Sequence, residues 1–147
     1  MDVFSKTKRS AVMAAIRNRN NRSTERTFAA LLRLHRISGW KLHSTALVGK
    51  PDFYFPSQRT AIFVDGCFWH GCPRCFRPPR QNASFWAKKI ARNRQRDITV
   101  KRCLHHKGIR VIRIWEHDIE ARAPRIRRLL ETLKASSRKT GRRVGHP

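Results

Sequence analysis

Acidic residues are scarce in this sequence of 147 residues. Only nine Asp and Glu oppose 34 Lys and Arg, so the formal net charge is +25. A surface with so little negative charge repels itself unless a polyanion neutralises it. The basic residues are spread along the whole chain instead of being confined to one amphipathic helix, and this distribution favours nucleic acid over a membrane surface as the partner.

Long apolar runs are also absent. The longest apolar stretch, around residues 60–64, is far shorter than the roughly 20 residues that cross a bilayer. No charged and then apolar leader opens the chain. We therefore expect a cytoplasmic protein with no membrane partner. The 39% hydrophobic content is sufficient for one compact domain.

Hydrophobic periodicity predicts a small sheet with helices around it. Helices are expected over residues 23–39 and 82–106 and from Pro124 onward. Aromatic and β-branched residues predict four strands, at residues 40–44, 52–55, 60–65 and 109–115. The order helix, three strands, helix, strand, helix predicts an α/β domain with a mixed sheet.

Charge and composition divide the chain into three segments. Residues 1–22 are polar and basic, and we interpret them as an arm that lies along DNA. Residues 23–135 contain the predicted helices and strands and form the domain. Residues 136–147 are basic and poor in apolar residues, which predicts a disordered tail.

Three of the four cysteines lie close together, as Cys67-x4-Cys72-x2-Cys75. Without a secretion signal, cysteines at such spacing are more often metal ligands than disulfide partners. Zinc needs a fourth ligand. Cys103 lies inside a predicted helix and is expected to be a packed thiol, whereas His117 follows the last strand and can reach the site. We predict a structural zinc site of these three cysteines and His117; reduced, unligated cysteines are the alternative.

The predicted hairpin between residues 52 and 65 contains a candidate cation site. A turn near residues 57–58 places Asp52 opposite Phe63 or Val64. The Asp52 carboxylate and the backbone near Val64 can therefore contact the same cation. A carboxylate and a carbonyl suit Mg²⁺, which polarises a phosphodiester. A simple turn residue is the other interpretation of Asp52.

Two aromatic residues and a histidine, Phe68-Trp69-His70, follow the first cysteine. Adjacent aromatic side chains cannot easily both enter one core, so we expect at least one to be exposed and able to stack on or wedge between bases. The alternative is that both pack beneath the metal loop. The imidazole of His70 is a candidate general base; it could equally be a metal ligand or an ordinary loop residue.

One stripe of the long predicted helix contains an acidic residue. Trp86, Ile90, Asn93 and Asp97 share a helical face. If this face covers the site, Asp97 orients and charges the imidazole of His70. Otherwise the carboxylate merely relieves repulsion among the basic residues of the helix.

The sequence then resembles a known family. Its motifs, in the family's order, are Phe63-Val-Asp-Gly-Cys-Phe-Trp-His70, Phe85-Trp86, Asn93-Arg-Gln-Arg-Asp97 and Trp115-Glu116. They resemble the very short patch repair (Vsr) DNA mismatch endonucleases from about Asp2 to His117. The resemblance implies a restriction-endonuclease-like fold, a variant of the PD-(D/E)xK core with a structural zinc. It also implies nicking of duplex DNA beside a thymine mispaired with guanine, the lesion left by deamination of 5-methylcytosine.

The resemblance also implies roles for individual residues. Asp52 and the Val64 carbonyl would bind catalytic Mg²⁺, and Glu25 would hold a water on that ion. His70 would be the general base and Asp97 its partner. The aromatic wedge would consist of Phe68, Trp69 and Trp86, and the zinc ligands would be Cys67, Cys72, Cys75 and His117.

Two features depart from the family pattern. Asp65 stands where members can have His, so we expect this catalytic-site carboxylate to contact metal or water. The second and fourth zinc ligands, Cys72 and His117, reverse the His and Cys found in some members.

The expected substrate is double-stranded DNA with a G·T mismatch, cut by a monomer at the bacterial nucleoid. Mismatch-repair proteins and a cytosine-5 DNA methyltransferase are expected partners in the cell. Two alternatives are a restriction-like nuclease without a mismatch requirement and a non-catalytic zinc protein that binds nucleic acid.

Overall fold

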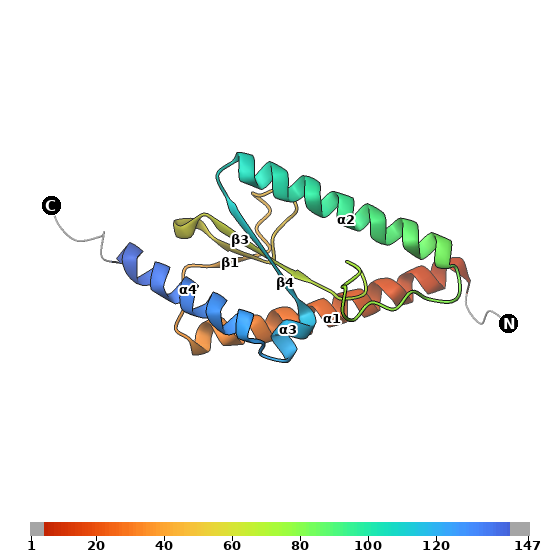
Figure 1. Ribbon diagram of the computed structural model, residues 1–147, viewed down its shortest axis with the longest axis horizontal. Helices are drawn as coiled ribbons and strands as arrows, with labels where there is room; N and C mark the ends of the chain where they lie inside the picture. The colour runs from red at the N-terminus through yellow and green to blue at the C-terminus, as the bar shows by residue number, and fades with distance from the viewer. Residues whose placement is uncertain (1–4, 142–147) are drawn as a thin grey trace.

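The computed structural model describes residues 5–141, in which three long α-helices and one short α-helix flank one sheet (Figure 1). The elements in chain order are α1 (Lys6–Leu34), β1 (Lys41–Leu42), β2 (Phe53–Phe55), the 3₁₀ helix η1 (Pro56–Gln58), β3 (Thr60–Asp65), α2 (Ala83–His106), β4 (Arg110–Trp115), α3 (Glu116–Glu120) and α4 (Pro124–Gly141).

The strands form one mixed sheet in the order β1-β2-β3-β4. β1 and β2 are antiparallel, as are β2 and β3, whereas β3 and β4 are parallel. Parallel neighbours need a crossover connection, which α2 provides. The predicted α/β fold with a mixed sheet flanked by helices is therefore confirmed.

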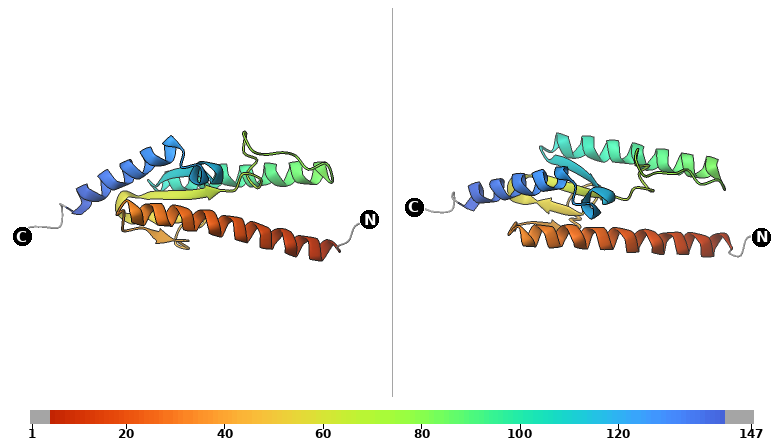
Figure 2. Two further views of the ribbon diagram at one scale, coloured as in Figure 1. Left: turned by 90° about the horizontal axis from the view of Figure 1, so that it is seen from below. Right: turned by 60° about the horizontal axis from the view of Figure 1, so that its bottom comes forward.

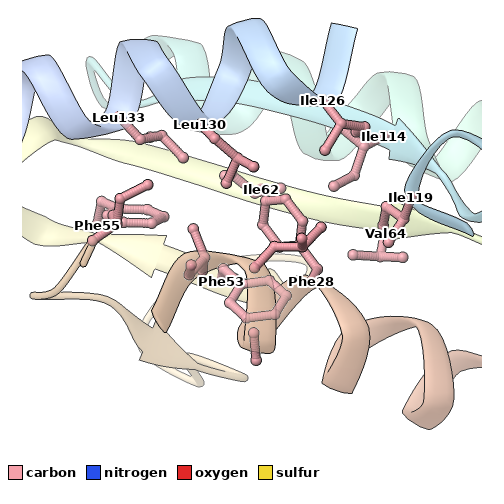
Figure 3. Packing of buried hydrophobic residues seen from close by; sticks show 14 residues of the cluster. Phe28, Phe53, Phe55, Ile62, Val64, Ile114, Ile119, Ile126, Leu130 and Leu133 are labelled. Carbon is pink, nitrogen blue, oxygen red and sulfur yellow. The ribbon is translucent and has the colours of Figure 1, made fainter. Parts of the chain in front are cut away.

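Both faces of the sheet are covered, and α1 and α2 lie on opposite sides of the strands (Figure 2). Side chains alternate between the faces along a strand. On one face Ile62 and Val64 pack in a cluster with Phe28 of α1 and Ile126 and Leu130 of α4 (Figure 3). All six residues of β3 are buried, as expected for a strand covered on both faces.

The opposite face of the sheet packs beneath α2. Ala61 and Phe63 contact a second cluster that includes Val100 and Leu104 of this helix. Asp65 has the same parity as Phe63 and therefore also faces α2. Because of this alternation, Asp65 at the end of β3 lies beneath α2, the helix that contains Asp97.

Two differences from the sequence predictions concern the ends of helices. α1 runs without a break through residues 22–23, so the predicted arm is the first part of this helix, and residues 1–4 lie outside the described range. Ser5 caps α1 by accepting a hydrogen bond from the Lys8 amide. Good helix formers extend the helix where apolar periodicity is weak. α4 continues to Gly141, so residues 136–141 of the predicted tail are helical, whereas residues 142–147 lie outside the described range.

Two further predictions are corrected. Cys103 is exposed on α2, so it is not a packed thiol. The short helix α3 was not predicted, and His117 lies in it. Within residues 5–141, no helix has the length and apolar character needed to cross a bilayer.

Candidate active site and metal centre

The Asp52 carboxylate lies beside the end of β3. Asp52 precedes β2, and the register that pairs Phe53 with Ile62 carries it toward the last residues of β3. The Val64 amide donates a hydrogen bond to Asp52 Oδ2 over 2.7 Å. The hairpin thus brings this carboxylate to the Val64 backbone, as the strand pairing predicted.

Two further side chains complete this end of the site. Glu25 reaches it from α1, and His43 reaches it from the residue after β1. His43 Nε2 and Glu25 Oε2 are 2.6 Å apart. Each of Glu25, His43 and Asp52 offers one ligand atom, and these three atoms lie within 4.8 Å of one another. His43 was not among the residues predicted from the sequence, although antiparallel pairing of the predicted strands places it beside Asp52.

The environment of Asp52 opposes its negative charge. Burial raises the pKa of Asp52 from 3.8 to about 7; the Val64 amide opposes this shift, and the nearby Glu25 adds to it. Two carboxylates and an imidazole in one partly buried cluster form a donor set that suits a divalent cation. A cation at this point would offset the repulsion between the two carboxylates.

His70 and Asp97 form a hydrogen-bonded pair, with His70 Nδ1 and Asp97 Oδ2 separated by 2.6 Å. Burial opposes ionisation of Asp97, but the hydrogen bond and charge of His70, together with Arg113, hold its pKa below the ordinary value. Asn93 on the same face of α2 donates to the Trp69 carbonyl over 2.8 Å. The predicted helical stripe therefore does face the histidine loop.

An arginine that was not predicted as a site residue, Arg113, joins two of the acids. Arg113 Nε donates to Asp65 Oδ2 and Nη2 donates to Asp65 Oδ1, over 2.7 and 2.6 Å. Arg113 Nη2 also lies 3.0 Å from Asp97 Oδ1. We expected Asp65 to contact metal or water, but both of its oxygens accept hydrogen bonds from this guanidinium. A charged residue with apolar neighbours in the middle of a strand was the available signal.

Most of these groups line one cleft, where the ends of β3 and β4 meet α2. Its charged and titratable lining consists of Asp52, Asp65, His70, Asp97 and Arg113 together with exposed Lys50 and Arg96. His70 Nε2 lies 3.9 Å from Asp65 Oδ1, so the histidine lies between the carboxylates of Asp65 and Asp97. The cleft therefore combines a candidate base, a candidate cation site and cationic residues that attract phosphate.

The predicted zinc ligands converge. His117 Nδ1 lies 3.1 Å from Cys67 Sγ, 3.6 Å from Cys72 Sγ and 3.4 Å from Cys75 Sγ. Tetrahedral zinc, with Zn–S of about 2.3 Å and Zn–N of about 2.0 Å, requires sulfur and nitrogen to be about 3.5 Å apart. The donor set and its spacing therefore fit a tetrahedral metal ion.

Neighbouring acids support the cysteine and histidine cluster. His117 Nε2 lies 3.3 Å from Asp118 Oδ1, the arrangement that fixes the ring of a metal-binding histidine. The Cys67 amide donates to Glu116 Oε1 over 2.8 Å. Burial raises the pKa of the Cys67 thiol, so in the absence of a cation this sulfur stays protonated.

The three predicted wedge residues form an aromatic cluster near the N-terminal end of α2, where Trp86 lies. Ring centroids are 5.2 Å apart for Phe68 and Trp69, 5.2 Å for Phe68 and Trp86, and 5.9 Å for Trp69 and Trp86. We expected either Phe68 or Trp69 to be exposed; instead both are half-buried. Phe85, which contacts Trp86 edge to face, is 58% exposed.

Comparison with known proteins identifies related sequences. The sequence model of a family described as DNA mismatch endonuclease Vsr matches residues 1–75. A Type II nicking enzyme, V.XorIIP of Xanthomonas oryzae pv. oryzae, is 37% identical over 136 residues, which cover 88% of this chain and 97% of that protein.

Two other relatives align with this chain over different shares of their length. The DNA mismatch endonuclease Vsr of Escherichia coli is 35% identical over 123 residues, covering 82% of this chain and 77% of that protein. The Type II nicking enzyme V.NaeI of Lentzea aerocolonigenes is 48% identical over 69 residues, covering 47% of this chain and 42% of that protein.

Proposed function

Because the chain belongs to the DNA mismatch endonuclease Vsr family and is a DNA endonuclease, we propose that it nicks duplex DNA 5′ to the thymine of a G·T mismatch. The mispair arises by deamination of 5-methylcytosine, and the nick would begin very short patch repair. The mixed sheet flanked by helices agrees with the restriction-endonuclease-like fold of the family. The observation that supports hydrolysis most directly is the His70–Asp97 pair in the cleft that also holds Asp52.

His70 is proposed as the general base. Asp97 accepts the hydrogen bond from Nδ1–H and thereby selects the tautomer in which Nε2 has a lone pair. Nε2 would take a proton from the attacking water while the water oxygen bonds to phosphorus and the P–O bond to one deoxyribose oxygen breaks. That oxygen would leave with the electron pair and take a proton from solvent. The negative charge of Asp97 would stabilise the imidazolium that forms.

Asp52 and the Val64 carbonyl are proposed to hold the catalytic cation, Mg²⁺, with Glu25 holding a water on that ion. The partly buried Asp52 carboxylate and its acidic neighbour Glu25 support this assignment, since their charges need a counterion. When bound, the ion would polarise the phosphodiester and stabilise the charge that develops on its oxygens.

The zinc ion is proposed to be structural. Cys67, Cys72, Cys75 and His117 would use all four tetrahedral positions, leaving none for substrate. Their loop immediately surrounds His70, and Arg94 of α2 donates to the His70 carbonyl over 3.2 Å. Zinc would therefore hold the catalytic histidine and the aromatic residues in place.

Phe68, Trp69 and Trp86 are proposed to form the wedge that enters DNA beside the mismatch. Opening a base step costs unstacking free energy, and a mispaired step resists least. The edge-to-face contacts among the three rings support one preassembled surface in preference to three independent side chains.

A nicking assay tests this function. Purified protein with Mg²⁺ is incubated with end-labelled duplexes that differ only in a G·T or a matched pair, and products are separated on a denaturing gel. We expect a nick in the mismatched strand alone, and we expect His70→Ala to slow it by about 100-fold or more. His35→Ala, at the end of α1, is the matched control. Absence of any nick would contradict the endonuclease site.

A second candidate is a strand-nicking enzyme with no mismatch requirement. Several relatives are described as Type II nicking enzymes, which favours nicking itself over selection of a mispair. Equal nicking of both duplexes would support this candidate and contradict G·T selectivity. The non-catalytic alternative is excluded because the chain belongs to an endonuclease family.

The cellular setting follows from the same proposal. The protein would act as a monomer in the bacterial cytoplasm, on DNA of the nucleoid. A cytosine-5 DNA methyltransferase would create the base whose deamination yields the lesion, and mismatch-repair proteins are proposed partners.

A further inference from the structure

His43 lies at the candidate cation site because of its place beside β2. Its backbone N–H donates to the Asp52 carbonyl over 3.1 Å, which continues the pairing of β1 with β2. Its φ of 46° is in the left-handed region, which few non-glycine residues adopt. The backbone therefore departs from the strand at this residue while its ring remains at the site.

The imidazole is directed at an acid on another element. His43 Nε2 lies 2.6 Å from Glu25 Oε2, and the ligand atoms of His43, Glu25 and Asp52 all lie within 4.8 Å of one another. The side chain of His43 is 58% exposed and that of Glu25 is 13% exposed. The histidine therefore contributes a nitrogen donor on the solvent side of two partly buried carboxylates.

A nitrogen donor changes which ion the site prefers. Mg²⁺ takes oxygen ligands in a nearly ideal octahedron. First-row transition ions accept imidazole together with carboxylate. A site made only of Asp52, Glu25 and the Val64 carbonyl would hold oxygen donors alone, so His43 is the group that distinguishes the two classes of ion.

We propose that His43 is a direct ligand of the active-site cation together with Asp52, beside Glu25, and that it makes this site prefer a transition ion such as Mn²⁺ over Mg²⁺. The proposal rests on the proposed cation at Asp52 and extends it to a residue and a metal preference. The competing possibility is that His43 only holds Glu25 by a hydrogen bond.

Binding measurements test the proposal without relying on nicking. Mn²⁺ is titrated into the zinc-loaded protein and followed by electron paramagnetic resonance, and Mg²⁺ binding is followed by calorimetry. His43→Gln can still donate a hydrogen bond to Glu25 but has no imidazole. His43→Asn tolerates the left-handed backbone but is too short to reach the site. Thermal unfolding shows whether each variant is folded.

We expect both variants to weaken Mn²⁺ binding by about tenfold or more, with a much smaller change for Mg²⁺. Electron spin echo spectra of the Mn²⁺ protein should show ¹⁴N coupling that His43→Gln abolishes and that the exposed control His106→Gln retains. Unchanged Mn²⁺ affinity in His43→Gln, or a wild-type spectrum without ¹⁴N coupling, would overturn the proposal.

The two proposals fail in different ways. Nicking with Mg²⁺ but no ¹⁴N coupling would overturn His43 as a ligand and leave the endonuclease site standing. Imidazole-dependent Mn²⁺ binding without any nick would support the ligand and contradict the proposed reaction. Absence of any divalent cation binding would overturn the ligand proposal.

Discussion

Arg113 holds the Asp65 carboxylate by both oxygens, with hydrogen bonds of 2.7 and 2.6 Å from Nε and Nη2. The same guanidinium lies 3.0 Å from Asp97 Oδ1. Removing it would leave both acids without this partner in a mostly buried site. We therefore expect Arg113→Met to lower the free energy of unfolding by about 3 kcal/mol, measured by urea denaturation. Arg110→Met, at an exposed position of β4, should change it little.

A double-mutant cycle checks the cause of that loss. If unpaired charge is responsible, adding Asp65→Asn to Arg113→Met should recover part of the lost stability. Additive losses from the two substitutions would show that Arg113 and Asp65 are not energetically coupled. Retention of wild-type stability in Arg113→Met would contradict the interpretation directly.

Zinc binding is expected to depend on Cys72 and not on Cys103. Cys72 is buried in the four-ligand cluster, whereas Cys103 is exposed on α2. Elemental analysis should find zinc in the wild type and in Cys103→Ser but a reduced content in Cys72→Ser. Losing several kcal/mol of binding free energy should lower the melting temperature of Cys72→Ser by roughly 10 °C or more. Equal zinc content in the two variants would rule out this ligand set.

Stability of the metal-free site is expected to fall as pH rises toward 7. The pKa of Asp52 is about 7 in the folded protein and 3.8 in the reference state, so between these values the folded state binds more protons than the unfolded state. The free energy of unfolding should therefore decrease with pH in this window, by up to about 1.4 kcal/mol per pH unit from this group.

Asp52→Asn removes the titrating group and serves as the comparison. Denaturation at several pH values between 4 and 8, with chelator present for divalent cations other than zinc, gives the difference between wild type and variant. The variant should gain stability relative to the wild type as pH rises. A difference that is constant with pH would contradict the raised pKa.

Trp86→Ala is expected to impair nicking of mismatched DNA. An aromatic ring stacked on a base contributes about 1–3 kcal/mol, so loss of the ring should reduce the single-turnover rate or affinity roughly tenfold to a hundredfold. Phe85→Ala removes a neighbouring exposed ring outside the proposed wedge and should have a smaller effect. Equal effects of the two substitutions would contradict the assignment of the wedge.

Sequence patterns were sufficient where one local rule decides the structure. Apolar and β-branched runs located the four strands, and α2 begins and ends within a residue or so of its predicted bounds. Hairpin pairing predicted the approach of Asp52 to Val64, and helical periodicity predicted the stripe that contains Asp97. The spacing of three cysteines predicted the cluster that His117 completes. The catalytic roles of these residues remain predictions.

The sequence by itself determined the mixed α/β fold, the DNA-directed charge and the three cysteines of the zinc-type cluster, because periodicity, charge and close spacing are local properties. Only the tertiary structure decided that Arg113 neutralises Asp65 and that His43 joins Glu25 and Asp52. Both contacts join residues from different elements, through the β3–β4 register in one case and the approach of α1 to β1 in the other. Such contacts depend on how elements pack and on which side chain reaches a shared point, and no local pattern encodes either.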